Sequence, residues 1–330
     1  MILLERIQFM VCVHCVTFNH SNYITDAMNG FTMQETNFPF VCTIVDDAST
    51  DGEQEVISNY LRKHFDLEDK TSVRNEETDD YVLTFAQHKT NRNCYFTVLY
   101  LKYNHYSIKK SKKSYFEVWN DTKYVAMCEG DDYWTDPLKL QRQVSFLKQS
   151  TDYLAVAENS FIYNTIKETK TLFSTEEERD LTLDELISKR RFATASVLCT
   201  QKIYRAFHEH TFKYRYDTMI WSFIASKGKF KYLTDVSSVY RRGMQGITEY
   251  TEPYKWASIV EKWNKELMLQ FGHLYNKRIS LENIYNEYWK SLHKIYNKRG
   301  FCINFFKCLY KCIYYNPQAT TKHFIKKIVK

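Results

Sequence analysis

The first part of the chain alternates between short apolar runs and amphipathic stretches. Residues 7–17 and 40–45 are almost continuously apolar and rich in β-branched side chains, which predicts two buried strands. Residues 23–32 and 56–61 space their apolar side chains as one face of a helix does. Because parallel neighbouring strands need a crossover connection, this strand–helix–strand–helix order predicts a parallel sheet.

The remaining pattern is uneven. Charge clusters interrupt residues 66–115, for which we expect a short strand, loops and one helix. Residues 124–128 predict a third buried strand, and Asp136-Pro137 predicts a helix start with Asp as N-cap and Pro at the first helical position. Further expected elements are a capping-box helix at Thr182-Leu183-Asp184-Glu185, strands at 193–198 and 230–233, a helix at 217–226, and helices from Pro253 to the end.

This pattern predicts an α/β domain over residues 1–250 and a helical extension over residues 251–330. The chain has 330 residues, of which 44% are hydrophobic and 26% charged, so a large core can form and wholesale disorder is excluded. Eight Gly and four Pro exclude collagen-like and linker-rich chains. Nine scattered cysteines, several in apolar runs, predict buried thiols of a reducing cytosol.

The carboxyl-terminal extension is strongly basic. Residues 254–330 carry 15 Lys and Arg against four Asp and Glu, whereas residues 1–253 carry 31 against 35. No acidic residue follows Glu287, and residues 301–315 form an apolar amphipathic stretch. This stretch is too short to span a bilayer, and residues 288–330 fit either an anionic membrane surface or packing on the body. No signal-peptide core is present either, so we expect a cytoplasmic protein, peripheral on a membrane in the first case.

Acidic pairs follow two of the predicted buried strands. Asp46-Asp47 ends the second strand, and Asp131-Asp132 follows the third, where parallel α/β sheets place their chemistry. Adjacent ionised carboxylates require a cation or strong donors, and oxygen ligands favour Mg²⁺ or Mn²⁺ bound together with substrate phosphates. A carboxylate apart from the metal, such as Asp217, could act as general base. Alternatively, each Asp only shapes a turn or caps a helix.

Three collinear segments carry a resemblance to a known family. Residues 17–20 (TFNH), 45–52 (VDDASTDG) and 129–140 (EGDDYWTDPLKL) resemble family 2 glycosyltransferases of the GT-A fold, and the likeness extends over about residues 9–248. The resemblance implies a Rossmann-like, mostly parallel sheet with helices on both faces. It also implies inverting transfer of a sugar from a nucleotide-sugar, usually a UDP-sugar, with Mg²⁺ or Mn²⁺ as cofactor.

The resemblance further implies roles for individual positions. It assigns the nucleoside loop to Thr17, Phe18 and Asn19, the base contact to Asp47 with Asp46 as its neighbour, the ribose and metal contacts to Asp131 and Asp132, and the catalytic base to Asp217. Nucleotide contacts are also expected between residues 66 and 105, with Arg74 and Asn104 as candidates. Many relatives carry a His in the loop that corresponds to residues 241–248, which has none here; Arg241 or Arg242 could supply positive charge to the diphosphate instead.

These observations predict a hexosyl- or N-acetylhexosaminyl-type glycosyltransferase of cell-surface polysaccharide, capsule or lipopolysaccharide synthesis. The expected acceptor is a saccharide or lipid-linked saccharide at the inner face of the plasma membrane, and no nucleic-acid partner is expected. The alternative is a non-enzymatic module that binds nucleic acid or membrane through its basic aromatic tail. A nucleotidyltransferase is disfavoured because no glycine- and lysine-rich phosphate loop lies near the amino terminus.

Overall fold

The computed structural model describes residues 7–68, 73–243 and 251–328, with side chains to residue 322. The chain forms two compact units. The first comprises residues 1–181, 191–210 and 227–242 and contains the sheet; the second comprises residues 182–190, 211–226 and 243–330 and its described elements are helical. The expected boundary at residue 250 stays a prediction.

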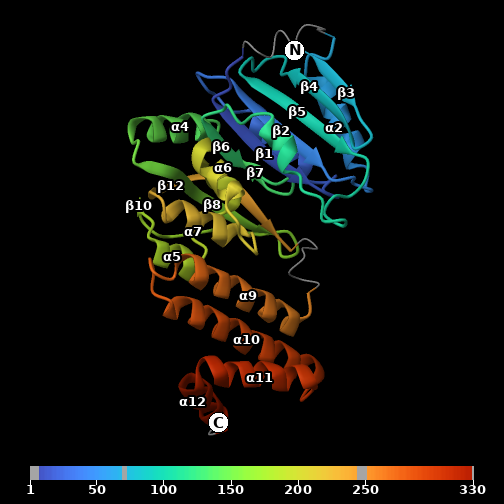
Figure 1. The fold of residues 1–330 in the computed structure, drawn as a ribbon. Coiled ribbons are helices and arrows are strands. Elements are labelled where there is room, and N and C mark those ends of the chain that lie inside the picture. The colour runs from blue at the N-terminus through green and yellow to red at the C-terminus, as the bar shows by residue number, and fades with distance from the viewer. Residues whose placement is uncertain (1–6, 69–72, 244–250, 329–330) are drawn as a thin grey trace. The chain divides into compact units, whose positions relative to one another are not determined.

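The first unit is built on a 12-stranded mixed sheet (Figure 1). Its strand order is β10-β12-β8-β11-β6-β1-β2-β5-β4-β3, with β7 and β9 attached to β12 and β8. The central strands β6, β1, β2 and β5 are mutually parallel. The strands are β1 (Val11–Thr17), β2 (Phe40–Asp46), β3 (Arg74–Glu77), β4 (Tyr81–Gln87), β5 (Cys94–Leu101), β6 (Tyr124–Met127), β7 (Tyr133–Trp134), β8 (Tyr153–Asn164), β9 (Thr169–Leu172), β10 (Arg179–Asp180), β11 (Val197–Thr200) and β12 (Lys229–Arg242).

Helices cover both faces of this sheet, which is why nearly every residue of its central strands β1 and β2 is buried. One face packs on α1 (Ile24–Thr32), α2 (Glu53–His64) and α4 (Lys139–Gln149). On the other face, His14 of β1 stacks on Phe116 of α3 (Lys113–Glu117), with 4.2 Å between ring centroids, and lies 3.2 Å from the Tyr204 hydroxyl of α6 (Gln201–Glu209). The expected α/β fold class, with a partly parallel central sheet between helices, is confirmed.

The expectation for residues 66–115 was right about one helix but wrong about the number of strands. This region contains three strands, β3 to β5, and α3 is only five residues long. The polar β3 pairs with β4 at the edge of the sheet, so neither burial nor alternation marked it as a strand. Residue 136 does not begin a helix, because α4 starts at Lys139 and the Asp136 carboxylate accepts a hydrogen bond from the Leu138 amide at 2.9 Å. Residues 194–196 form a 3₁₀ turn before β11.

The second unit bears out the expected helical extension and the capping box at Thr182. It contains α5 (Leu183–Ser188), α7 (Asp217–Ala225), α9 (Pro253–Phe271), α10 (Arg278–Arg299), α11 (Ile303–Tyr315) and α12 (Pro317–Ile328). Across the described residues, no helix combines the length and apolarity that a membrane span requires. The nine cysteines are unpaired, and all except the half-buried Cys302 are buried, as expected.

Candidate functional site

β1 is the point at which the order of strands along the chain changes sides in the sheet. From β1 the chain adds β2 and then β5 on one side, and it later returns to place β6 on the other side. In open α/β sheets such a switch point opens a crevice at the carboxyl ends of the strands, where ligands bind. Thr17 at the end of β1 pairs with Asp46 of β2, and the Gly130 amide donates to the Val16 carbonyl at 3.2 Å. The three segments that carry the resemblance therefore meet at one edge.

The loops after β1 and β2 are tied together by a buried carboxylate that sequence reasoning missed. Glu53, the first residue of α2, accepts hydrogen bonds from the Thr17 hydroxyl, the His20 amide at 2.9 Å and the Ser49 hydroxyl at 2.8 Å. Burial raises the pKa of Glu53, against these three hydrogen bonds, which lower it. The sequence did offer one sign of this role: Glu53 directly follows Gly52 and begins a helix, and a helix N-terminus favours a carboxylate.

Asn19 fixes the conformation of the first loop. Its backbone adopts φ 57°, a left-handed conformation that Asn tolerates better than most residues. Its side-chain oxygen accepts from the Thr50 amide at 2.8 Å, and its own amide donates to the Ser49 hydroxyl at 2.9 Å. Phe18, between two anchored neighbours, leaves 41% of its surface exposed. The predicted nucleoside loop thus presents one aromatic ring to solvent at the sheet edge.

Asp47 is buried and held entirely by protein donors. One oxygen accepts from the His105 amide at 2.7 Å; the other accepts from the Tyr106 amide at 3.1 Å and pairs with the Lys112 ammonium at 2.8 Å. The Asn104 side chain donates to the Asp47 carbonyl at 2.9 Å, so this candidate lies at the site. Arg74, the other candidate, lies on the edge strand β3. In this structure Asp47 positions the segment after β5, and its predicted contact with a base stays a prediction.

Asp46, although adjacent, has a different environment. Its Oδ2 accepts hydrogen bonds from the Ser49 amide and the Gln54 side chain. Its Oδ1 is buried with no hydrogen-bond partner among the described residues. Burial raises the pKa of Asp46, whereas the hydrogen bonds from Ser49 and Gln54 lower it. A cation or donor near this oxygen would compensate for the burial of its charge.

The acidic pair after β6 shows a similar contrast. The Asp132 carboxylate accepts from the Arg241 amide at 2.8 Å, which ties the acidic turn to the end of β12. The Oδ1 of Asp131 is buried and has no hydrogen-bond partner in the described part of the chain. The Oδ2 of Asp131 lies 4.0 Å from the His20 imidazole, which sequence reasoning did not assign. A histidine therefore lies beside this acidic pair, but it comes from the loop after β1 and not from the loop of residues 241–248.

Arg241 is a clamp between elements at this edge. Its guanidinium donates to the Asp131 carbonyl at 2.8 Å and forms an ion pair with Asp26 of α1. Tyr133 and Tyr23 flank it, with ring centroids 4.3 Å and 5.0 Å from the guanidinium carbon. Its predicted contact with the donor stays a prediction. Residues 244–248 of the loop that lacks a His lie outside the described residues.

The donor set fits a hard divalent cation that arrives with a diphosphate. No group of three or more His, Cys, Asp or Glu side chains that could hold a metal occurs among the residues described. Mg²⁺ and similar ions commonly bind through one or two carboxylates plus substrate phosphates. The unpaired oxygens of Asp131 and Asp46 offer hard ligands of this kind. The residues present therefore fit such an ion with few protein ligands.

Asp217 belongs to the second unit. It is the first residue of α7 and lies 3.3 Å from the guanidinium of Arg190. Its assignment as catalytic base stays a prediction.

Trp134 and Trp221 are core residues. Trp134 is buried, and its indole nitrogen donates to the Ala195 carbonyl at 2.7 Å. Trp221 is buried in α7. Cys12 and Cys15 belong to different core clusters, so their thiols do not converge on a metal.

Comparison with known proteins extends the fold assignment. No protein-family model matches the chain. The chain is 27% identical over 245 residues to the uncharacterised proteins Rv1520 of Mycobacterium tuberculosis and Mb1547 of Mycobacterium bovis. The match covers 73% of this chain and 62% of each relative, so the chain spans less than two thirds of their length.

Two solved structures of S. aureus TarS residues 1–349 resemble the chain. The complex with UDP-GlcNAc aligns with a TM-score of 0.58 at 14% identity, covering 94% of this chain and 83% of that one. The complex with UDP aligns with a TM-score of 0.57 at 14% identity, covering 94% and 82%. At this identity the likeness establishes the fold, and the fold is one that holds a nucleotide-sugar in TarS.

Proposed function

We propose that the chain is an inverting glycosyltransferase of family 2 that transfers a hexosyl or N-acetylhexosaminyl group from a nucleotide-sugar, with a UDP-sugar favoured. The observation that carries the proposal is the meeting of Asp46, Asp131 and Asp132 at the switch point of the sheet. Two of these carboxylates keep a buried oxygen without a partner among the residues that the structure describes. The fold shared with TarS, which was crystallised with UDP-GlcNAc, supports the same conclusion.

Different residues at this edge would bind different parts of the nucleotide-sugar. The exposed Phe18 would pack against a base or ribose, and the segment held by Asp47 would lie beside it. Asp131, with Asp132 behind it, would hold Mg²⁺ or Mn²⁺ against the diphosphate. Such an ion, when bound, stabilises the negative charge that develops on the departing diphosphate. Arg241 holds the acidic turn in place through the Asp131 carbonyl.

The acceptor hydroxyl must lose a proton as it attacks the anomeric carbon. We assign this proton transfer to Asp217, whose carboxylate lies at the N-terminus of α7 beside Arg190. Attack opposite the leaving diphosphate would invert the anomeric configuration. The proposed product is a cell-surface polysaccharide, capsule or lipopolysaccharide unit built on a saccharide or lipid-linked saccharide at the cytoplasmic face of the membrane.

The test is calorimetric titration of the full chain with UDP-GlcNAc, UDP and GDP, with and without Mn²⁺, followed by transfer to saccharide acceptors. We expect a uridine nucleotide to bind more tightly with Mn²⁺, and Asp131→Asn to remove the metal-dependent part. Asp217→Asn should retain nucleotide binding and lose transfer. Equal, metal-independent binding of all nucleotides would contradict the proposal, and normal transfer by the Asp217 variant would remove that residue from the base role.

The second unit supports attachment to an anionic membrane surface. The buried side of α11 packs on α10 through Phe305, Cys308 and Cys312. Its opposite side is apolar but exposed at Ile303, Phe306, Tyr310, Ile313 and Tyr314, which recur at helical spacing. Lys294, Lys298 and Lys307 are exposed in the same unit. A helix with this composition lies in a membrane interface, and each basic residue adds about 1 kcal/mol on an anionic surface.

Flotation of the full chain with phosphatidylglycerol-containing vesicles tests this attachment. We expect binding that weakens as salt increases, little binding to pure phosphatidylcholine, and loss on Phe306→Ser with Ile313→Ser. Leu269→Ser is the matched control, because Leu269 is an exposed apolar residue of α9. Unchanged flotation of the double variant would contradict the role of α11. The alternative of a nucleic-acid-binding tail predicts instead salt-dependent binding to DNA or RNA and no nucleotide-sugar binding.

A further inference from the structure

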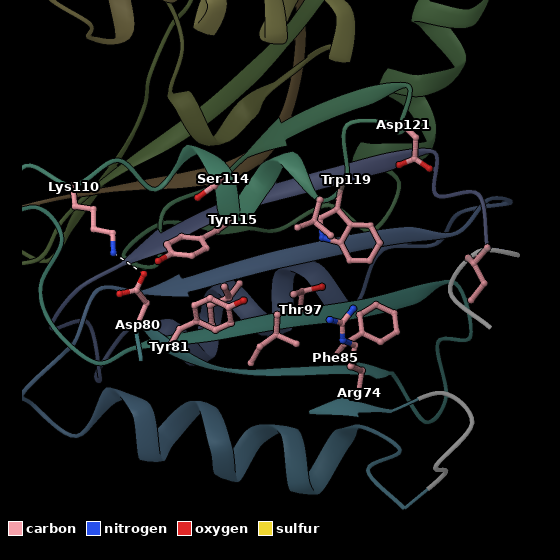
Figure 2. Close-up of a pocket in the computed structure, with 14 residues that line it drawn as sticks. Arg74, Asp80, Tyr81, Phe85, Thr97, Lys110, Ser114, Tyr115, Trp119 and Asp121 are labelled. Atoms are coloured by element: carbon pink, nitrogen blue, oxygen red, sulfur yellow. Dashed lines mark hydrogen bonds and ion pairs between the residues drawn. The ribbon is translucent and has the colours of Figure 1, made fainter. Parts of the chain in front are cut away.

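A cavity of about 540 Å³ lies on the face of β4 and β5 in the first unit (Figure 2). The segment from Lys110 to Asp121 forms its opposite wall. We call this cavity the trough. It is lined by Ile7, Arg74, Asp80, Tyr81, Leu83, Phe85, Thr97, Leu99, Lys110, Ser114, Tyr115, Val118, Trp119 and Asp121. Of the candidate site residues predicted from the sequence, only Arg74 is among them.

The trough exists because α3 is short. A helix that crosses between two parallel strands ordinarily covers the sheet face, but α3 ends after five residues. Leu83 of β4 and Leu99 of β5 therefore line a cavity as well as packing near Tyr115 of α3. Aromatic rings border it at both ends: Tyr81 meets Tyr115 edge-on at 5.5 Å, and Phe85 lies 5.8 Å from Trp119.

Two buried polar atoms in the trough have no hydrogen-bond partner among the described residues. The Thr97 hydroxyl and the Trp119 indole nitrogen lack a hydrogen bond to any described residue, although their side chains are only 4% and 8% exposed. Figure 2 shows both side chains in the space between β5 and the segment above it. A buried polar group is costly unless it is paired, and Trp offers only a donor. A ligand with an acceptor oxygen or nitrogen would pair with the Trp119 indole.

Charged side chains lie at the rim and balance one another. Lys110 pairs with Asp80 at 2.6 Å at one end, and Arg74 and Asp121 lie towards the other, as Figure 2 shows. Two basic and two acidic residues give no net charge, so the lining selects neither an anion nor a cation. A pocket with aromatic rings in its middle and polar groups at its rim suits a ligand that has apolar faces and polar edges.

We propose that the trough binds an uncharged saccharide, as a second carbohydrate site distinct from the nucleotide-sugar site. The C–H faces of a sugar ring pack on aromatic rings such as Tyr81 and Tyr115, and its hydroxyl edges can pair with Thr97 and Trp119. A purely apolar ligand would leave both polar atoms unpaired. The inference rests on the proposed function, which makes saccharides the expected ligands.

The trough is connected to the nucleotide-sugar site by one short segment. His105, Tyr106 and Lys112 hold Asp47 from one side of this segment. Lys110 and Tyr115, from the same segment, line the trough. A saccharide that packs on Tyr115 therefore contacts the segment that Asp47 positions.

Saturation-transfer NMR on the full chain tests the proposal. The probes are the methyl glycosides of glucose, galactose, mannose and N-acetylglucosamine and short oligomers of N-acetylglucosamine, measured with UDP and the diamagnetic Mg²⁺ in excess so that the nucleotide site is occupied. We expect at least one probe to give transfer signals, and Thr97→Val or Trp119→Phe to weaken its binding by about tenfold, the effect of one lost hydrogen bond of ordinary strength.

Thr43→Val is the matched control. Thr43 is buried at the position of β2 that pairs with Thr97 in β5, lies 3.6 Å from the Cys12 thiol, and does not line the trough. It should leave saccharide binding unchanged, and Thr97→Val should fold because it removes an unpaired hydroxyl. Absence of signals from every probe, signals unaffected by the trough variants, or binding of decanoate without any saccharide would each overturn the proposal.

The same samples separate this inference from the proposed function. Titration with UDP reports on the nucleotide site, and we expect neither Thr97→Val nor Trp119→Phe to change it by more than about twofold. Normal UDP binding without saccharide binding overturns only the trough. Saccharide binding without UDP binding contradicts the proposed function and retains the trough as a carbohydrate site.

Discussion

Gly130, between Glu129 and Asp131, is the position where the packing of the site can be tested most directly. A Cβ built on Gly130 would lie 2.1 Å from the Thr17 hydroxyl oxygen, 2.6 Å from the Thr17 Cβ and 3.1 Å from the Ile24 side chain. Carbon atoms in contact are ordinarily about 3.5–4.0 Å apart. Rotation of Thr17 cannot remove the second contact, because its Cβ is fixed to the backbone of β1. Gly130→Ala must therefore separate the ends of β1 and β6.

The magnitude follows from this geometry. Overpacking a buried position typically costs about 1–3 kcal/mol, which in a unit of this size lowers the melting temperature by about 2–12 °C. Thr17 also carries the hydrogen bond to Glu53, and its carbonyl accepts from the Asp47 amide at 3.0 Å. Displacement of Thr17 thus moves both loops of the site. Misplacement of a site by about 1 Å can cost about 100-fold, so we expect UDP affinity to fall at least tenfold.

Thermal unfolding and calorimetric titration with UDP and Mn²⁺ measure both effects. Gly300→Ala is the control, because Gly300 has φ 64° but no atom within 4 Å of its added Cβ, and it lies in the second unit. It should lower stability through backbone strain alone and leave UDP affinity unchanged. A Gly130→Ala protein that melts within about 1 °C of the wild type and binds UDP normally would refute the packing argument.

Three further predictions concern charge. Asp132→Asn should destabilise the protein more than Asp131→Asn, as measured by urea unfolding, because Asp132 holds the Arg241 amide; the reverse order would contradict this assignment. Burial raises the pKa of Asp46, so its contribution to the free energy of unfolding is present at low pH and is lost as pH rises through the folded pKa. The melting temperature of Asp46→Asn, relative to that of the wild type, should therefore be higher at pH 8 than at pH 4. Burial lowers the pKa of Lys139 from 10.5 to about 8. The free energy of unfolding should therefore rise by up to about 3 kcal/mol as the pH rises from the lower of these pKa values to the higher, and Lys139→Met should not show this rise.

The central strands β1, β2 and β6 were predicted because both of their faces are buried, whereas the equally buried β5 was not assigned. Every residue of β2 is buried, and such runs are visible in the sequence as unbroken apolar segments. The antiparallel edge was not predictable from the same rule. β3 is polar, and its pairing with β4 depends on a partner and not on its own pattern. The shortness of α3, and hence the trough, also could not be inferred from residues 105–120 alone.

The carboxylates at strand ends were predictable from their place in the chain, but their partners were not. Glu53 and His20 acquire their importance only when the loops after β1 and β2 meet. The contact between His20 and Asp131 joins residues separated by more than a hundred positions. A single sequence gives no sign of such pairings, because they depend on strand order.

The two acidic pairs share an arrangement that explains why each pair has two members. In each pair the second carboxylate is engaged by backbone amides: those of His105 and Tyr106 for Asp47, and that of Arg241 for Asp132. The first member, Asp46 or Asp131, keeps a buried oxygen without a hydrogen bond within the described structure. The second member thus holds a distant segment against the sheet edge, and this anchoring fixes the first member where its oxygen can meet a cation or donor. A lone Asp at either position would supply the ligand or the anchor, but not both.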